Sequence, residues 1–457
     1  GIFVLTGRAA AVNAGPAVWL SFVIAGVAST FAGLCYAEMA SMIPISGSAY
    51  TYAYATMGEL VAWIIGWDLI LEYLVGAATV SVGWSGYVSE FIKHVTGHQL
   101  PAEWINAPLV WVEKGKALPG GAIAEAGQFA VTGAWLNVPA MLIVLAVTVI
   151  LILGIKESAR FNAVIVFIKV AVVLLFIAFA APFVRRENWQ PFIPENTTGH
   201  FGSFGLSGIF QGATMVFFAY IGFDAVSTAA QEARRPQRDL PIGILSSLAI
   251  CTVLYIAVSS ILTGVVPYSN LNVAHPVAVG AEATGLRWLV LAIEVGAIAG
   301  LSSVMLVMLL GQPRIFFSMA QDGLFPPVAA RVHPRFGTPH ITTAITGVAC
   351  AVAGGVLPID ILGELTSIGT LFAFVLVSLG VMILRLTRPD IPRAFKVPGG
   401  PYLVPLCGAV TSGVLMYTAT TATIVRLFGW LALGLIIYAC YGRRHSKLRA
   451  AQEAAAA

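Results

Sequence analysis

The sequence predicts an all-α protein that crosses a lipid bilayer many times. Hydrophobic residues make up 58% of the chain and charged residues only 10%, and the mean hydropathy is +0.88. A soluble domain keeps about a quarter of its residues charged, so the composition excludes one. Long apolar runs follow one another along the chain, and a helix needs about 20 such residues to cross the bilayer.

Eleven apolar runs have the length of a membrane-spanning helix. Because lipid offers the backbone no hydrogen-bond partners, runs of this length must be helices rather than barrel strands. The segment from Gly1 to Ala11 is too short to cross, and we expect it to be the second half of a further span, which would make twelve. The eleven complete spans are expected at about residues 16–42, 60–92, 138–154, 161–183, 206–230, 240–267, 286–312, 340–357, 364–385, 401–421 and 424–442.

Lysine and arginine are unevenly distributed between alternate loops. One set of loops holds 16 of these residues and the other set holds 8. Cytoplasmic loops carry the excess of basic residues, so the sequence predicts a cytoplasmic C-terminus with residues 443–457 as an internal tail. The long loop 94–137 then lies outside, and we expect it to be a solvated connector with one surface helix.

The sequence contains no recognisable motif for a metal, a cofactor or an enzyme. The five cysteines lie in apolar runs without metal-binding spacing, which favours packed thiols. All seven histidines lie in loops or at span ends, and neither HExxH nor GxSxG occurs. We therefore expect no enzymatic activity, no metal, no cofactor and no nucleic-acid partner.

Six ionisable side chains are expected inside the spans: Glu38, Asp68, Glu72, Lys169, Asp224 and Glu294. Each costs at least ~2.5 kcal/mol at mid-bilayer unless it faces water or a partner. Asp68 and Glu72 are four residues apart, so they share a helix face that must look into protein or water. Glu38 is expected at the cytoplasmic interface. Glu294 lies between small residues and could be structural or functional.

Lys169 is the most informative of the six. It is the ninth residue of the run 161–183, which puts it roughly 13 Å along the helix at 1.5 Å per residue. One interpretation is a structural ion pair with a carboxylate of a neighbouring helix. The other is a group whose protonation changes during a work cycle, because burial disfavours the charged form of lysine and lets it exchange a proton near neutral pH.

Glycines interrupt two of the spans. They are Gly208, Gly212 and Gly222 in the sixth span and Gly1 and Gly7 in the short first segment. Such glycines can simply permit close packing of helices. The first and sixth spans are, however, corresponding members of two five-helix halves, a position that indicates the binding site of a transporter. An unwound helix offers free N–H and C=O groups, which together suit a zwitterion.

The motifs around these glycines resemble the amino acid–polyamine–organocation superfamily. Residues 1–4, GIFV, resemble the end of its first-helix motif, G-x-G-IF. Residues 217–244 resemble its sixth helix and the following loop, with the sequence FFAYIGFDAVSTAAQEARRPQRDLPIGI. Residues 313–326, PRIFFSMAQDGLFP, resemble the loop after its eighth helix. The sixth span and residues 365–385 are most similar to the cationic amino acid transporter branch, and the resemblance covers essentially the whole chain.

The resemblance implies a fold and a function. The fold is the five-plus-five inverted repeat of the leucine transporter class, with halves at 1–183 and 206–385, two further helices in 401–442, and a first helix that is truncated in this chain. The function is secondary transport of L-amino acids across the cytoplasmic (plasma) membrane by proton-coupled symport and alternating access. An amino-acid exchanger, or a nutrient sensor built on the same fold, is the alternative.

The resemblance also implies a substrate site made largely of backbone. The amide of Gly1 should meet the substrate carboxylate, and the carbonyls of Phe218, Ala219 and Ile221 its ammonium. Phe218 also matches an aromatic that gates the site. Lys169 matches a lysine that stands where sodium binds in sodium-coupled relatives.

Side-chain selectivity is expected to depend on Met308, which matches a position that touches the substrate side chain. Met305, on the same helix face, is the alternative. A bulky thioether shortens the pocket and favours small neutral amino acids such as alanine, whereas the cationic branch predicts arginine and lysine. Glu72 could then attract a cationic side chain. Met308 could also pack only against a neighbouring helix.

Overall fold

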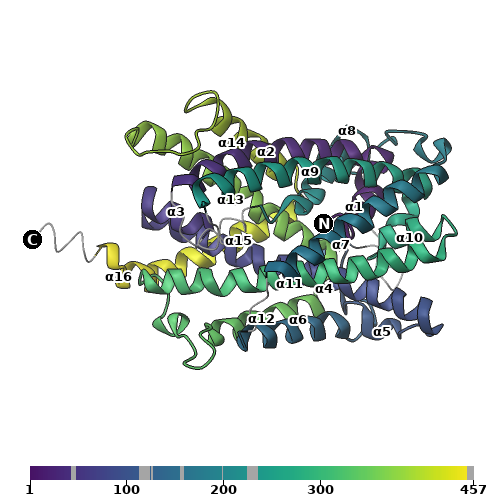
Figure 1. Ribbon diagram of the computed structural model, residues 1–457, viewed down its shortest axis with the longest axis horizontal. Coiled ribbons are helices and arrows are strands. Elements are labelled where there is room, and N and C mark those ends of the chain that lie inside the picture. Colours follow the sequence, from purple (N-terminus) through teal and green to yellow (C-terminus); the bar gives the residue numbers. More distant parts are fainter. Residues whose placement is uncertain are drawn as a thin grey trace, which may run out of the picture.

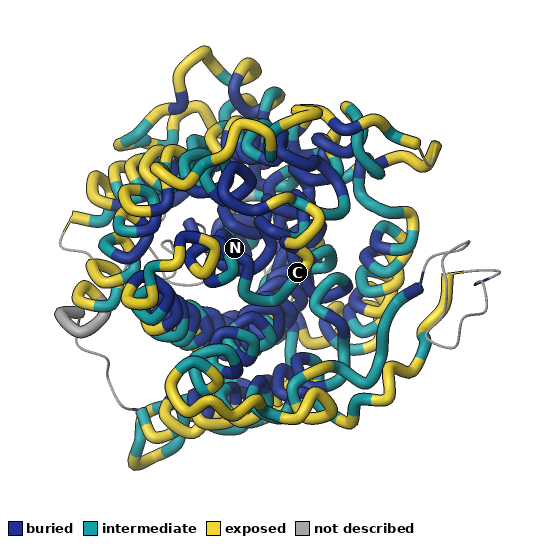
Figure 2. Tube along the Cα trace, turned by 90° about the vertical axis from the view of Figure 1, so that its right-hand side faces the viewer, coloured by how far each residue is buried: buried dark blue, intermediate teal, exposed yellow. Residues whose placement is uncertain are grey.

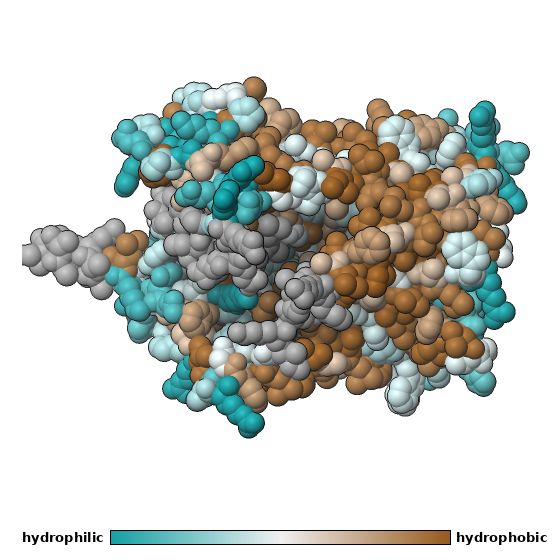
Figure 3. Space-filling view, viewed as in Figure 1, coloured by the Kyte–Doolittle hydropathy of each residue, from teal (hydrophilic) through white to brown (hydrophobic). Residues whose placement is uncertain are grey.

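The computed structural model describes residues 1–42, 48–112, 124, 127–154, 159–197, 199–223 and 235–449. Its helices lie side by side and form an elongated bundle (Figure 1). Seen end-on, buried residues gather in the interior and exposed residues on the outer faces of the helices (Figure 2). On the face drawn in Figure 3, apolar side chains cover the middle of the bundle and hydrophilic ones gather at its two ends. This is the surface of a protein whose middle lies in lipid.

A helix lies in each of the eleven expected runs. Among the described residues, seven helical stretches are long and apolar enough to cross a membrane, and α6, α12 and α14 are shorter apolar helices. The eleven are α2 (Val18–Met42), α4 (Glu59–Thr96), α6 (Val138–Ile152), α7 (Ala159–Ala180), α8 (Gly205–Val216), α9 (Pro236–Val265), α11 (Arg287–Gln321), α12 (His340–Val356), α13 (Ile359–Thr387), α14 (Leu403–Tyr417) and α15 (Thr421–Ile437).

The first segment is helical from near its beginning. The carbonyl of Gly1 accepts hydrogen bonds from the amides of Val4 and Leu5, both at 3.0 Å, and α1 (Leu5–Ala9) follows. The chain then turns at Gly15, whose φ of 59° lies in the left-handed region that favours glycine. In both Figure 1 and Figure 2 the N-terminal end lies near the middle of the bundle.

Helix α11 is longer than expected. The prediction that residues 313–326 form a loop is wrong for their first part, because α11 continues through Pro313 to Gln321. Proline removes one helical hydrogen bond, but membrane helices tolerate it where neighbouring groups compensate. The preceding side chain, Gln312, donates to the carbonyl of Ile70 on α4 at 3.2 Å.

The long loop after α4 contains two strands that the sequence did not indicate. After the short α5 (Ala102–Ile105), β1 (Leu109–Val112) pairs antiparallel with β2 (Gln128–Val131). Trp111 and Phe129, opposite each other in the register, pack edge to face at 5.1 Å between ring centroids. The expectation of a connector with one surface helix is therefore incomplete. Gly120 and Gly121 lie outside the described residues.

Glu38 is a buried ion-pair partner, not the interfacial carboxylate that the sequence led us to expect. Its side chain is 1% exposed and pairs with two arginines, Arg385 and Arg393. Arg393 Nε lies 3.1 Å from Oε1, and Arg385 Nε donates to the same oxygen at 2.8 Å. The amide of Val397 donates to Oε2 at 2.8 Å. The arginines follow Glu38 by more than 340 positions, which is why the sequence does not reveal the pairing.

We expect Glu38→Gln to lower the free energy of unfolding by about 3–5 kcal/mol, because it leaves two buried guanidinium groups without their carboxylate. Chemical unfolding of the detergent-purified protein measures this. The matched control is Glu187→Gln, which removes an exposed carboxylate and should change stability by less than about 0.5 kcal/mol. Equal stability of the two variants would contradict the assignment.

Candidate substrate site at two interrupted helices

Helix α8 is interrupted in the region where the sequence predicts a binding site. Regular α-helix ends at Val216, and a tight 3-10 turn, Phe217–Tyr220, follows. Ile221 is extended, with ψ of 134°, and Gly222 has φ of 124°, which side chains other than glycine rarely allow. Asp224 lies outside the described residues.

The interrupted helix contacts the beginning of the first segment. A Cβ atom on Gly1 would lie 2.1 Å from the Cα atom of Ala219. The two backbones therefore touch, and only glycine fits at position 1. This contact places Gly1 next to Ala219. Phe218 and Ile221, two other predicted site residues, lie close by because they are in or directly after the same turn.

Two of the predicted backbone acceptors already accept one hydrogen bond. The hydroxyl of Tyr255, on α9, donates to the carbonyl of Ala219 at 2.8 Å. The amide of Ile221 donates to the carbonyl of Phe218 at 3.3 Å. A carbonyl oxygen has a second lone pair, so both remain able to accept from a ligand. Sequence reasoning missed Tyr255, whose hydroxyl in the middle of an apolar run was the available signal.

Lys169 lies beside this contact. Its aliphatic stem crosses Gly300 of α11, where an added Cβ would lie 2.6 Å from Cδ. Lys169 lies in the neighbourhood of the Gly1 backbone nitrogen and of the Cys251 side chain. Among the described residues no carboxylate lies within ion-pair distance of Lys169, so the structural ion pair considered above has no partner there.

Met308 of α11 packs against α4, the helix that carries Asp68 and Glu72. The sulfur of Met308 would be 3.0 Å from a Cβ on Gly76, one helical turn after Glu72. Met308 thus packs against a neighbouring helix, on the side of α4 that carries Glu72, so both interpretations of its role stay open. Asp68 and Glu72 are 0% and 1% exposed, which confirms that their shared face looks into protein. Both oxygens of Asp68 are buried without a hydrogen-bond partner in the described part of the chain.

A cavity of about 680 Å³ lies apart from the predicted site residues, at the end of the bundle that holds α5 and the hairpin. It is lined by Val4, Leu5 and Arg8 of the first segment, by Glu90 of α4 and by residues of the long loop. Arg8 forms an ion pair with Asp360 and donates to Asn272 Oδ1 at 3.0 Å. The cavity is not lined by any of the predicted substrate-site residues, which are Gly1, Phe218, Ala219, Ile221 and Met308.

Three features define the class of protein: many apolar helices, an interrupted helix in contact with the first segment, and a half-buried lysine near them. Together they indicate a multi-pass membrane protein built for transport. The chain belongs to the amino acid permease family, whose model matches residues 1–440. This confirms the resemblance drawn from the motifs, and the family consists of transport proteins rather than enzymes.

The relatives of the chain are named after different substrates. The chain is 48% identical to the branched-chain amino acid permease BcaP of Bacillus subtilis, over 98% of this chain and 90% of that one. It is 44% identical to a methylthioribose transporter of Bacillus subtilis, over the same shares of the two chains. It is 36% identical to the vacuolar cationic amino acid transporter 4 of Arabidopsis thaliana, over 85% of this chain and 61% of that one.

The contact between Lys169 and Gly300 can be tested directly. We expect Gly300→Ala to displace the lysine stem and to lower the rate of substrate uptake into liposomes, while the protein stays folded. Gly413→Ala is the matched control, because an added Cβ at that membrane-helix glycine meets no atom within 4 Å. Uptake that is unchanged in both variants would mean that the position of Lys169 is unimportant.

Proposed function

We propose that the chain is a secondary transporter of L-amino acids that works by proton-coupled symport and alternating access. One observation carries the proposal: the interrupted helix of one half of the chain touches the first segment of the other half at Ala219 and Gly1, near Lys169, which has no carboxylate partner among the described residues. Free backbone groups at such breaks suit an α-carboxylate and an α-ammonium. Two of the three relatives named above are permeases or transporters of amino acids.

The packing of the helices supports a five-plus-five repeat with twelve spans. In such a repeat, the two halves are related by a pseudo-twofold axis and equivalent helices meet. Here α2 packs against α9, α4 against α11 and α6 against α12. Each pair joins the helices that occupy the same place in the proposed halves 1–183 and 206–385.

The proposed orientation has the C-terminus in the cytoplasm and the long loop outside. The 16 basic residues in one set of loops against 8 in the other support it. Figure 1 draws α16 (Arg443–His445) and α5 at opposite ends of the bundle, as this orientation requires. The membrane would be the cytoplasmic (plasma) membrane.

The substrate is proposed to be a small neutral amino acid such as alanine. The thioether of Met308 fills space beside α4 and gives a cationic side chain only a weak acceptor. The second candidate is a cationic amino acid. Met308 packs on Gly76, and Glu72, one helical turn before Gly76, has a carboxylate that could attract a cationic side chain. A substrate screen should also include branched-chain amino acids and methylthioribose, after the names of two relatives.

We expect uptake to follow an inward proton gradient and to need no sodium. Lys169→Ala should abolish driven uptake without unfolding the protein, since a small neutral residue removes the cost of a charge within a membrane helix. Lys169→Arg should also fail, because arginine keeps the charge but does not release its proton. Lys396→Ala, at an exposed lysine, is the control. Liposome uptake that follows a sodium gradient at fixed pH would refute the coupling.

We expect Met308→Ser to raise the affinity for arginine relative to alanine by about tenfold, because a hydrogen bond to a charged group contributes ~1.5–3 kcal/mol. Binding assays with both amino acids on wild type and variant measure the ratio. Met416→Ser, on α14, is the matched control. An unchanged ratio would place selectivity elsewhere, with Met305 and Glu72 as the next residues to test.

A further inference from the structure

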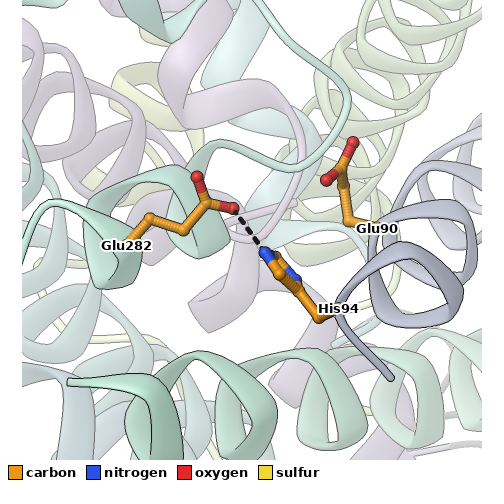
Figure 4. Close-up of side chains that lie close together, drawn as sticks. All are labelled: Glu90, His94 and Glu282. Carbon is orange, nitrogen blue, oxygen red and sulfur yellow. Dashed lines mark ion pairs between the residues drawn. The ribbon is translucent and has the colours of Figure 1, made fainter. Parts of the chain in front are cut away.

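A cluster of histidine and glutamate side chains lies at the end of the bundle where α4 ends and α11 begins. Glu90 and His94 are one turn apart on α4, and Glu282 ends α10 (Pro276–Glu282). One ligand atom from each of the three lies within 4.8 Å of the others. Figure 4 shows the His94 ring between the two carboxylates, with Glu282 approaching from the other helix. Nothing in the proposed transport cycle uses these residues.

Two of the histidine–carboxylate pairs in the cluster are farther apart than a hydrogen bond. His94 Nε2 lies 3.6 Å from Glu282 Oε1, and His275 Nε2 lies 3.7 Å from Glu90 Oε1. A hydrogen bond would need about 2.7–3.2 Å. Two ligands bound to one tetrahedral zinc ion at about 2.1 Å are roughly 3.4 Å apart. Small side-chain adjustments would bring both pairs to that spacing.

His94 is held in the way that a metal-binding histidine is held. Its Nδ1 lies 2.7 Å from Oε1 of Glu294, a carboxylate whose side chain is fully buried. With Nδ1–H donating to that carboxylate, the lone pair of Nε2 faces Glu282. A carboxylate behind the ring fixes both the orientation and the tautomer of a histidine ligand, and such outer partners typically accompany zinc sites. This gives Glu294 a role that does not depend on transport.

The charges and the donor atoms favour a divalent ion of the zinc type. Three carboxylates, from Glu90, Glu282 and Glu294, face one ammonium: Lys93 Nζ lies 2.7 Å from Glu90 Oε2, which leaves Oε1 for the cluster. Arg287 donates to the main-chain oxygen of His94 at 3.4 Å rather than to a carboxylate. Imidazole nitrogen combined with carboxylate oxygen suits Zn²⁺, whereas Mg²⁺ and Ca²⁺ prefer oxygen ligands alone.

We propose that Glu90, His94 and Glu282 form a binding site for a zinc-type divalent cation, with His275 next to Glu90. The ion would tie α10 to α4. Because Pro276 at the start of α10 packs directly on Gly7, where an added Cβ would lie 2.3 Å from its Cβ, the ion would also steady the first segment. Metal binding at this site does not depend on which amino acid the protein transports.

Titration calorimetry of the full-length, chelator-treated protein with ZnCl₂ tests the proposal. We expect one saturable site for Zn²⁺ and no comparable binding of Mg²⁺. His94→Gln and Glu282→Gln should each weaken zinc binding by at least about tenfold, as loss of a ligand or its partner does. His98→Gln and Glu103→Gln, which change an exposed histidine and an exposed glutamate nearby, should bind as the wild type does.

A gain-of-affinity variant keeps the test decisive if a loss variant does not fold. Glu282→His replaces an exposed carboxylate by an imidazole and should tighten zinc binding, with a larger rise in the thermal midpoint on addition of ZnCl₂. Absence of saturable binding to the wild type would overturn the proposal. So would zinc binding that none of the three substitutions changes, because the ion would then sit elsewhere, for example on the exposed thiol of Cys440.

Discussion

The direct contact of the Gly1 backbone with the backbone at Ala219 is the constraint on which the centre of this molecule depends. Within a bilayer the backbone of a spanning segment is favoured as continuous helix, because lipid cannot satisfy a free N–H or C=O. At this point the helix of residues 205–216 stops, and the polar groups that it frees must find partners within the protein. Tyr255 satisfies one of them, at Ala219. The carbonyl of Phe218 accepts only the amide of Ile221, and such carbonyls are the groups that the proposed function assigns to the substrate ammonium.

Charged side chains in the bundle are accommodated in three different ways. Glu38 is matched by two guanidinium groups and one amide, so its burial costs little and fixes α13 and the segment after it against α2. Asp68 has no hydrogen-bond partner in the described part of the chain, so no neighbouring group offsets the cost of its burial. Lys169 lies between these extremes, since its stem is packed and its ammonium stays near the interrupted helices. A charged side chain with partners, such as Glu38, is therefore a candidate for a structural role. One without partners among the described residues, such as Asp68, is a candidate for a functional role.

The sequence was sufficient for the features that depend on local composition. The eleven apolar runs coincide with helices, because length and hydropathy decide that outcome residue by residue. The sequence was insufficient where a side chain has its partner at a distant position in the chain. Glu38 looked interfacial because its arginines lie more than 340 positions away, and His94 and Glu90 showed only a one-turn spacing until α10 supplied Glu282. The family motifs predicted that Gly1 and Ala219 line one substrate site, but not that their backbones touch. The helix through Pro313 was missed because proline usually ends a helix.

Helix α1 is held unequally at its two ends. At its inner end the backbone of Gly1 packs on Ala219, and the hydroxyl of Tyr87 donates to the carbonyl of Phe3 at 2.6 Å within buried surroundings. At its outer end the ion pair between Arg8 and Asp360 is partly exposed, at 23% and 21% of the side-chain surface. An ion pair so close to solvent contributes about 0–1 kcal/mol. Alternating access, as proposed above, requires the site to open toward one side at a time. Of these contacts, the ion pair between Arg8 and Asp360 is the one that an opening of the proposed site would separate at the lowest free-energy cost.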